Sequence, residues 1–256
     1  MPLPVVKTPT YNTMLPLRKE KVAFRPFLVK EEKILLIAMQ SEDKEQIADG
    51  INEIVSNCTF GKIDPRKEKY DLGDIEYLFV QMRAKSKGEV SEFKMACKGE
   101  IVTKTKANKA KKIVASETRT PCENILDVSV DMTEIKIDAG TISNTFEIPN
   151  GPTIVFRHPD FKETMGISEI KDVDGVMDLF KKFTEQVYDE AEVYKFKDYS
   201  DAEVLEFLES LDSSVFQHFQ EFLADIPRIY YDIESTCPAC KTDNKYHLSG
   251  IESFFG

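Results

Sequence analysis

The sequence predicts an α+β fold, in which an extended N-terminal arm and helices precede a small antiparallel β region. C-terminal helices then end in a β-hairpin built around a pair of cysteines. Three observations predict this order. Five prolines in residues 1–28 exclude a helix there. Apolar residues next recur at helical spacing up to residue 88, and the apolar period shortens to two over residues 89–158 before helical spacing returns.

The N-terminal part consists of the arm, residues 1–28, and a helical region, residues 29–88. Within the arm, Lys21–Phe27 alternates in part between apolar and polar residues, which predicts a short edge strand. Val29–Gln40 is rich in Glu, Lys, Leu and Ile and predicts the first helix. Apolar residues three or four positions apart predict two more, one starting near Asp43 and one ending near Gly88.

The β region is expected over residues 89–158. Period-two segments predict strands at Glu92–Lys98, Ile125–Ile137, Thr145–Ile148 and Thr153–Arg157. Between the first two strands, residues 103–121 carry five lysines and no apolar period. We therefore expect a mobile, basic hairpin loop in this stretch.

Residues 159–227 predict a second helical region, and residues 228–256 predict a terminal hairpin and tail. The helices are indicated by apolar stripes over Val176–Val187, Val204–Leu211 and Val215–Ile226, and the second opens with the capping-box sequence Ser200–Glu203. Aromatic stripes at this spacing indicate core packing rather than a cofactor site. In the terminal part, Ile229–Glu234 and Lys245–Leu248 predict strands on either side of the cysteine pair.

Charge and hydropathy narrow the classes of function. The net charge is −11, and from residue 160 onward the chain holds 22 acidic and nine basic residues. Such an acidic half repels a phosphate backbone and argues against nucleic acid as a partner. The longest apolar run, Ile34–Met39, is far shorter than a membrane span, and the first twelve residues lack the apolar region of a signal peptide. We expect a protein that stays where it is made.

The sequence Cys237-Pro238-Ala239-Cys240 is the one local signature of chemistry. Two thiolates separated by two residues on a tight turn supply half of a tetrahedral zinc site. Cys97 ends one predicted strand and Cys122 begins the next, so these two residues complete the best-supported ligand set for a structural Zn²⁺. His247, on the returning strand, is the alternative ligand.

The cysteines have two other interpretations, a redox-active pair and a buried thiol. Redox-active pairs lie between a strand and the N-terminus of a helix, whereas the residues after Cys240 form a polar turn that leads into a strand. Cys58 falls on the apolar face of its predicted helix, which indicates a buried thiol. Structural zinc is therefore favoured over redox chemistry.

No catalytic motif accompanies this pair. The chain lacks a glycine-rich phosphate loop, a serine at a strand-to-helix elbow and a helix with two zinc-binding histidines. Its carboxylates are numerous, but no pair of them stands out from the charged background. We expect a protein that is not an enzyme and has no small-molecule substrate.

Several motifs, taken in their order along the chain, resemble the baseplate hub subunits and hub-assembly proteins of T-even-type contractile-tailed phages, the myoviruses. They are Leu15-Pro16, Val22, Phe24-Arg25-Pro26-Phe27 with Val29–Lys33, Arg83–Ser86 with Gly88-Glu89, the phenylalanine-rich helix, the Cys237–Cys240 pair and Gly250–Phe255. The family pattern also has cysteines near the positions of Cys97 and Cys122. In this chain a long basic stretch separates them.

The resemblance implies a late protein of virion assembly, either a hub component or a hub-assembly chaperone. It implies other tail and baseplate hub proteins as partners, and no catalytic residues. It places the protein in the host bacterial cytoplasm during assembly, and a hub component would then remain in the tail baseplate of the virion whereas a chaperone would leave. The alternative is a zinc-ribbon regulatory or nucleic-acid-binding adaptor that uses the lysines of residues 104–112.

Phe24, Arg25 and Phe27 are the predicted contact with a partner. Extended segments that contain proline become ordered on a partner at a low entropic cost, and Phe and Arg are common interface residues. The alternative is that Phe24 and Phe27 pack on the helix that follows them.

Overall fold

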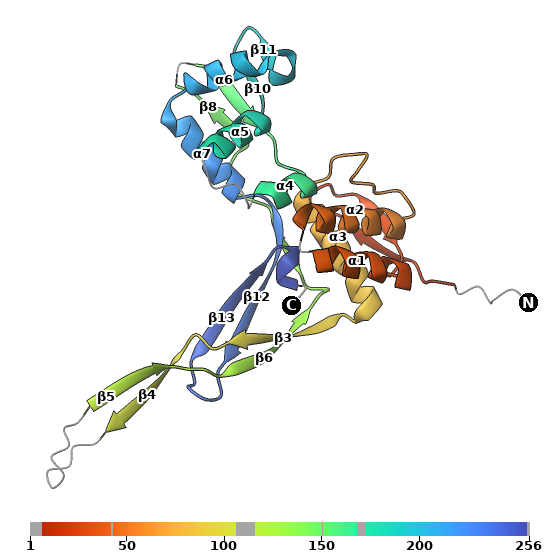
Figure 1. Ribbon diagram of the computed structural model, residues 1–256, viewed down its shortest axis with the longest axis vertical. Coiled ribbons are helices and arrows are strands. Elements are labelled where there is room, and N and C mark those ends of the chain that lie inside the picture. The colour runs from red at the N-terminus through yellow and green to blue at the C-terminus, as the bar shows by residue number, and fades with distance from the viewer. Residues whose placement is uncertain (1–6, 42, 106–115, 150, 168–172, 255–256) are drawn as a thin grey trace, which may run out of the picture. The chain divides into compact units, whose positions relative to one another are not determined.

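The computed structural model describes residues 7–41, 43–105, 116–149, 151–167 and 173–254. The chain folds as two compact units. The first unit comprises residues 1–86 and 137–228, and the second comprises residues 87–136 and 229–256. Helices and small antiparallel sheets together confirm the predicted α+β class (Figure 1).

The first unit begins with a hairpin and three helices. The elements are β1 (Tyr11–Met14), β2 (Lys21–Phe24), α1 (Val29–Ser41), α2 (Lys44–Cys58) and α3 (Leu72–Lys87). The side chain of Asp43 accepts hydrogen bonds from the first turn of α2, which explains why this helix starts there. The three predicted helices are thus present.

The strand predicted within Lys21–Phe27 is present as β2, and β1, which was not predicted, pairs with it in antiparallel register. Leu15, Val22 and Phe24 are fully or almost fully buried, so the hairpin is part of the core. Asp74 on α3 accepts the backbone N–H groups of Leu17 and Arg18 at 2.8 and 3.0 Å, which fixes the turn between the two strands. The prolines exclude a helix here, but they do not exclude a hairpin, because the outer edges of a two-stranded hairpin need no further backbone N–H donors.

The later part of the first unit is a four-stranded antiparallel sheet with helices. The sheet has the order β11 (Val193–Lys195), β10 (Thr184–Tyr188), β9 (Thr153–Phe156) and β8 (Thr145–Glu147). The helices are α4 (Phe161–Ile167), α5 (Val173–Phe183), α6 (Asp201–Glu209) and α7 (Ser213–Ala224), with a 3-10 turn, η2 (Phe196–Asp198), before α6.

Aromatic rings fill the core of this part, as the stripes predicted. Phe156, Phe180, Phe219 and Phe222 are almost completely buried and contact one another with ring centroids 4.9 to 6.1 Å apart. The expected stripe over Val176–Val187 is not a single helix, however. The helix α5 ends at Phe183, and the next residues pair with β9 as β10, which gives Val187 a buried place in the sheet.

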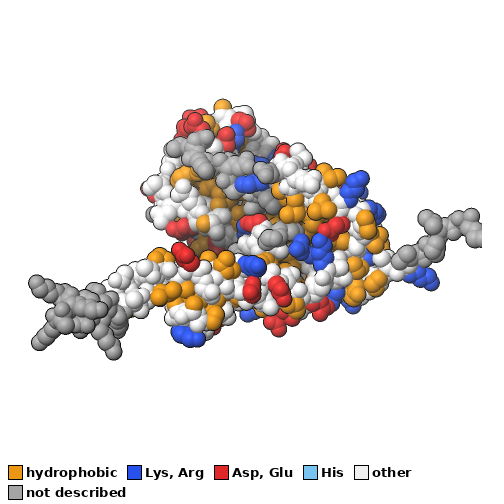
Figure 2. All heavy atoms as spheres, turned by 60° about the horizontal axis from the view of Figure 1, so that its bottom comes forward, with side chains coloured by type: hydrophobic (Ala, Val, Ile, Leu, Met, Phe, Trp, Pro, Cys, Tyr) orange, Lys and Arg blue, Asp and Glu red, His pale blue; other side chains and the backbone are white. Residues whose placement is uncertain are grey.

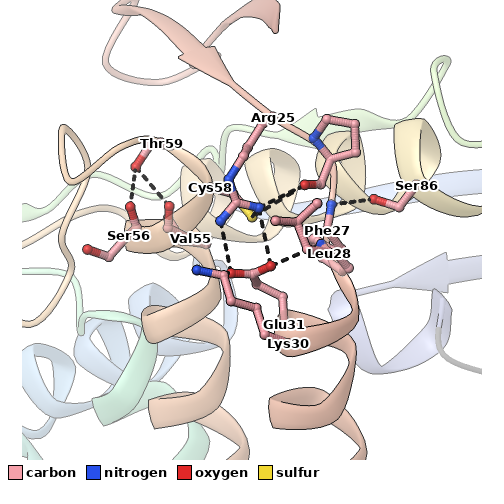
Figure 3. Close-up of polar contacts among 11 residues, drawn as sticks. Arg25, Phe27, Leu28, Lys30, Glu31, Val55, Ser56, Cys58, Thr59 and Ser86 are labelled. Carbon is pink, nitrogen blue, oxygen red and sulfur yellow. Dashed lines mark hydrogen bonds and ion pairs between the residues drawn. The ribbon is translucent and has the colours of Figure 1, made fainter. Parts of the chain in front are cut away.

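The same set of contacts occurs twice in the first unit. After β2, the Arg25 guanidinium binds the Glu31 carboxylate through two nitrogens at 3.2 and 2.9 Å, and the Leu28 N–H donates to the same carboxylate (Figure 3). After β9, Arg157 binds Glu163 at 2.8 and 2.9 Å, and the Asp160 N–H donates to Glu163.

The two sites also share their backbone contacts. The Arg25 N–H donates to the carbonyl of Cys58, the last residue of α2, and the Arg157 N–H donates to that of Phe183, the last residue of α5. The residue after each of these helices is a threonine, Thr59 or Thr184, whose hydroxyl donates four residues back. A hairpin, an arginine and two helices therefore form one arrangement, present in both parts of this unit.

The second unit consists mainly of hairpins. Its elements are β3 (Val90–Ala96), β4 (Glu100–Thr105), β5 (Ser116–Pro121), β6 (Ile125–Asp131), β12 (Arg228–Thr236), β13 (Asp243–Ser249) and η3 (Ile251–Phe254), and β7 (Lys136–Asp138) spans the boundary with the first unit. Strand β3 pairs with β6, β4 with β5, and β12 with β13, all antiparallel.

The expected loop at residues 103–121 is shorter than predicted. Residues 103–105 continue β4, and residues 116–121 form β5, so the two ends of this stretch pair with each other. Threonines alternate on both strands, and β-branched residues favour this extended pairing. Residues 106–115, which carry four of the five lysines, lie outside the described residues.

Candidate metal centre

Cys97 and Cys122 lie on neighbouring segments between two strand pairs of the second unit. Cys97 follows β3, and Cys122 follows β5. The Cys97 N–H donates to the Asn124 carbonyl at 2.9 Å, and the Cys122 N–H donates to the Gly99 carbonyl at 2.8 Å. These bonds connect the β3–β6 ladder to the β4–β5 ladder, so both cysteines are held at the junction between them.

Cys237 and Cys240 occupy the turn of the β12–β13 hairpin. The Cys237 N–H donates to the Thr242 carbonyl, and the Lys241 N–H donates to the Cys237 carbonyl, both at 2.9 Å. Lys241 has a φ of 64°, in the left-handed region, which lets the chain reverse sharply after Cys240. Backbone N–H groups of the turn then face the Cys237 sulfur.

The four sulfurs form a single cluster. The Sγ atoms of Cys97, Cys122, Cys237 and Cys240 all lie within 4.8 Å of one another. The Cys97 and Cys240 sulfurs are 3.5 Å apart, and those of Cys122 and Cys237 are 3.8 Å apart. Both separations far exceed the roughly 2.0 Å of a disulfide. Four zinc–sulfur bonds of about 2.3 Å in a tetrahedron would place neighbouring sulfurs about 3.8 Å apart. The cluster therefore has the dimensions of a tetrahedral thiolate site.

Backbone and amide N–H groups surround these sulfurs. The Gly99 N–H donates to Cys97 Sγ at 3.3 Å, and the Asn124 side-chain amide donates to Cys237 Sγ at 3.5 Å. Such donors stabilise the negative charge of thiolates and orient metal ligands. The donor set thus suits deprotonated cysteines bound to a cation.

Asn244 joins the two cysteine-bearing segments. Its side-chain oxygen accepts the Lys98 N–H at 2.7 Å, and its amide nitrogen donates to the Thr242 carbonyl at 2.9 Å and toward Cys97 Sγ at 3.6 Å. The residue is only 2% exposed. A buried amide that makes bonds to both segments holds them together beside the cysteine sulfurs.

Gly99 is required by close packing against the other turn. A Cβ at this position would lie 2.3 Å from Thr242 Oγ1 and 2.8 Å from Cys240 Sγ. Distances under 3.0 Å to these atoms leave no room for a side chain. Glycine therefore lets the two turns approach closely enough for their sulfurs to meet.

The thiols differ in acidity. Backbone N–H groups of Cys240 and Ala239 lower the pKa of Cys237 to about 6, against the effect of burial. The Thr242 side chain and backbone lower the pKa of Cys240. At Cys122 a backbone hydrogen bond from Asn124 is outweighed by burial and the neighbouring cysteines, which raise the pKa to about 12. The Cys122 thiol therefore holds its proton at neutral pH, whereas Cys237 readily loses its own.

The structure brings together the four cysteines of the favoured ligand set. The alternative ligand, His247, lies opposite Asp232 in the β12–β13 ladder, and its Nδ1 is 2.7 Å from the Asp232 carboxylate. Its position, several residue pairs from the turn, keeps it out of the cysteine cluster. Cys58 is buried at the end of α2 in the first unit, and burial raises the pKa of its thiol to about 12.

The predicted partner-contact residues lie largely inside the first unit. Phe24 is 2% exposed, and the buried Arg25 is paired with Glu31 (Figure 3). Phe27 is half-buried against Phe79 of α3, with ring centroids 5.2 Å apart. The Phe24 ring centroid lies 5.9 Å from that of Tyr11 on β1, so the ring contacts of the two phenylalanines are to β1 and α3 and not to α1, the helix that directly follows them.

Sequence reasoning missed the residues that support the cluster, Gly99, Asn124, Thr242 and Asn244. A glycine two positions after Cys97 and an asparagine four positions after Cys240 were the available signals. Both resemble ordinary turn residues, and their roles depend on the other segment being nearby.

In the described residues, no helix has the length and apolar content needed to cross a membrane. A family model described as T4 bacteriophage base plate protein matches residues 8–256 of the chain. No curated protein and no solved structure matched it.

Proposed function

Since the chain belongs to the T4 bacteriophage base plate protein family, we propose that it acts in the tail baseplate as a hub component or a hub-assembly chaperone. It does so by binding other baseplate proteins and not by catalysis. The match over residues 8–256 carries this proposal, because it covers both units. The protein assembles with its partners in the host bacterial cytoplasm.

Exposed apolar side chains on the second unit support a binding function. Val90, Ile101, Val102 and Ile125 are 42 to 59% exposed, on strands β3, β4 and β6. In Figure 2, orange hydrophobic side chains are visible at the surface between the grey residues at the left and the middle of the view. In the described residues, β4 pairs with β5 alone and β3 with β6 alone, so these ribbons present open edges. Open edges with apolar side chains are common docking surfaces for a strand of another protein.

We assign Zn²⁺ as the ion of the cysteine cluster. Four thiolates at tetrahedral spacing match the ligands that zinc takes in structural sites. All four ligand positions would be filled by protein, which leaves no open position for a substrate. Bound there, the ion holds the β12–β13 turn to the junction of the other two hairpins and so makes the second unit a rigid platform.

Mass spectrometry distinguishes a hub component from a hub-assembly chaperone. A tagged chain is isolated from infected cells, and purified virions are analysed in parallel. Other baseplate proteins should co-purify with the tagged chain; a hub component is also present in virions, whereas a chaperone is absent from them. If a phage that lacks this protein still gave normal infectious particles, both the hub role and the chaperone role would be refuted.

Paired surface variants test the platform. Ile101→Ser with Ile125→Ser should reduce co-purification of baseplate proteins without loss of folding. The matched control is Leu36→Ser with Ile37→Ser, which changes side chains of similar exposure on α1. Equal loss in both pairs would contradict a specific role for the second unit.

A further inference from the structure

A pocket of about 480 Å³ opens on the first unit between the β10–β11 hairpin and the start of α6. Four aromatic side chains line it, those of Tyr194, Phe196, Tyr199 and Phe207. Tyr199 is 45% exposed, and two further apolar residues nearby, Tyr188 on β10 and Val193 on β11, are also exposed. The pocket and its surroundings thus form an apolar surface that the described residues of this unit leave open.

Two carboxylates stand among these rings. Asp189 accepts the N–H groups of Ala191 and Glu192 through Oδ1, and Glu203 accepts hydrogen bonds from Ser200 through Oε2. These bonds lower the pKa of both groups, so both are ionised at neutral pH. They also fix the two side chains while the second oxygen of each remains an acceptor for a cation.

The elements around the pocket are strongly acidic. Residues 184–209 contain nine Asp or Glu and two Lys, a net charge of −7. An occupant should therefore combine apolar side chains with positive charge. The chain itself contains such a segment. Residues 103–115 carry five lysines and no acidic residue, and they include Lys111-Lys112-Ile113-Val114.

We propose that this pocket binds the basic segment, residues 103–115, of a second copy of the chain. The apolar pair Ile113-Val114 enters the aromatic pocket, and Lys111 and Lys112 meet the carboxylates of Asp189 and Glu203. Because the pocket and the segment come from different parts of the sequence, each copy offers one of each, and the contact is head-to-tail. Successive contacts of this kind build rings or filaments. The inference depends neither on the metal nor on the proposed baseplate role.

Sedimentation of the full chain is the first test. It should show concentration-dependent oligomers that dissociate as salt is raised, because exposed charge pairs are screened. Two variants should each be monomeric: Lys111→Glu with Lys112→Glu, which alters the segment, and Tyr194→Ala, which alters the pocket. An equimolar mixture of the two retains one intact pocket and one intact segment, and should give dimers that do not extend.

A peptide with the sequence of residues 103–115 provides the second test. Its fluorescence anisotropy is measured with the Lys111→Glu, Lys112→Glu protein, whose pocket is unchanged. Adding Tyr194→Ala should weaken binding about ten-fold, as expected for loss of an aromatic anchor. Tyr199→Ser serves as a second pocket variant if Tyr194→Ala proves unfolded by circular dichroism. A peptide of the same composition with Ile113 and Val114 moved apart should bind more weakly.

A full chain that stays monomeric at low salt would overturn the proposal, even if the peptide binds. Equal binding of the peptide by the intact and altered pockets would also overturn it. If oligomers form but survive both variants, another surface joins the copies, and the proposal is again wrong.

Discussion

Replacing Glu31 by glutamine removes a negative charge from a buried ion pair while keeping the volume of the side chain. The Glu31 side chain is 0% exposed and that of Arg25 is 8% exposed (Figure 3). Although burial raises the pKa of Glu31, hydrogen bonds from Arg25 and the Leu28 N–H outweigh it and keep the pKa lowered. The Glu31 carboxylate is therefore charged, and its removal leaves the buried Arg25 guanidinium without a negatively charged partner.

The second copy of the arrangement provides a matched comparison within one chain. Glu163 makes the same contacts with Arg157, but the two side chains are 16% and 22% exposed. Removing one partner of a buried pair costs about 3–5 kcal/mol of unfolding free energy. A partly solvated pair should lose about 1–2 kcal/mol, between the values for buried and exposed pairs. We expect Glu31→Gln to be clearly the more destabilising change.

Urea unfolding followed by circular dichroism measures both losses at neutral pH. The slope with urea should remain unchanged, so that a shift of the midpoint reports stability. Glu190→Gln, at an exposed position, is the control and should have almost no effect. Arg25→Met combined with Glu31→Gln should recover much of the loss, because no buried charge is left without a partner. Equal losses for Glu31→Gln and Glu163→Gln, or no recovery in the double variant, would refute the reasoning.

Four further outcomes are expected. Protein purified without chelator should carry about one zinc per chain by elemental analysis. Cys237→Ser should abolish zinc binding and destabilise the second unit, since metal binding contributes to folding. Wild-type protein that contains no metal would exclude the site. Asn244→Ala should lower zinc affinity about 10- to 100-fold in a competition titration, as for other groups that orient metal ligands, whereas its exposed neighbour Lys245→Ala should not. Gly99→Ala should reduce zinc content because its Cβ has no space beside Cys240, and full occupancy would show that the turns can separate. Finally, burial raises the pKa of Glu163, but Arg157 and the Asp160 N–H bring the pKa down to about 2. The stabilisation by the Glu163 carboxylate is therefore fully present above about pH 4.5 and is lost as the pH falls toward 2. The difference in unfolding free energy between wild type and Glu163→Gln should vanish as the pH is lowered from about 4.5 to about 2.

The helices were largely predictable because their signals are local. Apolar spacing located α1, α2, α3, α6 and α7, and the capping box at Ser200–Glu203 is present as predicted. The strands β1, β4, β5 and β11 were missed because short strands gain their stability from pairing partners, which period alone does not identify. Val187 was assigned to the wrong element for the same reason, since pairing with β9 decides its conformation.

The repeated arrangement in the first unit was also present in the sequence, in a form that is easy to overlook. Phe24-Arg25 precedes Lys30-Glu31, and Phe156-Arg157 precedes Lys162-Glu163 at the same spacing. Four identities over eight residues are weak on their own. They become meaningful once both arginines are seen to bind the glutamate six residues later and the last carbonyl of a helix.

The sequence by itself determined that the chain has an α+β fold and that its cysteines suit a metal, because residue periodicity and the chemistry of a Cys-x-x-Cys turn are local properties. Only the tertiary structure decided which ligands meet. Cys97 lies 143 residues from Cys240, and Cys122 lies 115 residues from Cys237, so their proximity depends on how separate hairpins pack. That packing requires Gly99, which has no side chain, and Asn244, which bonds to both segments. It also keeps His247 opposite Asp232, away from the cluster, because the register of a β-hairpin fixes every pair along it.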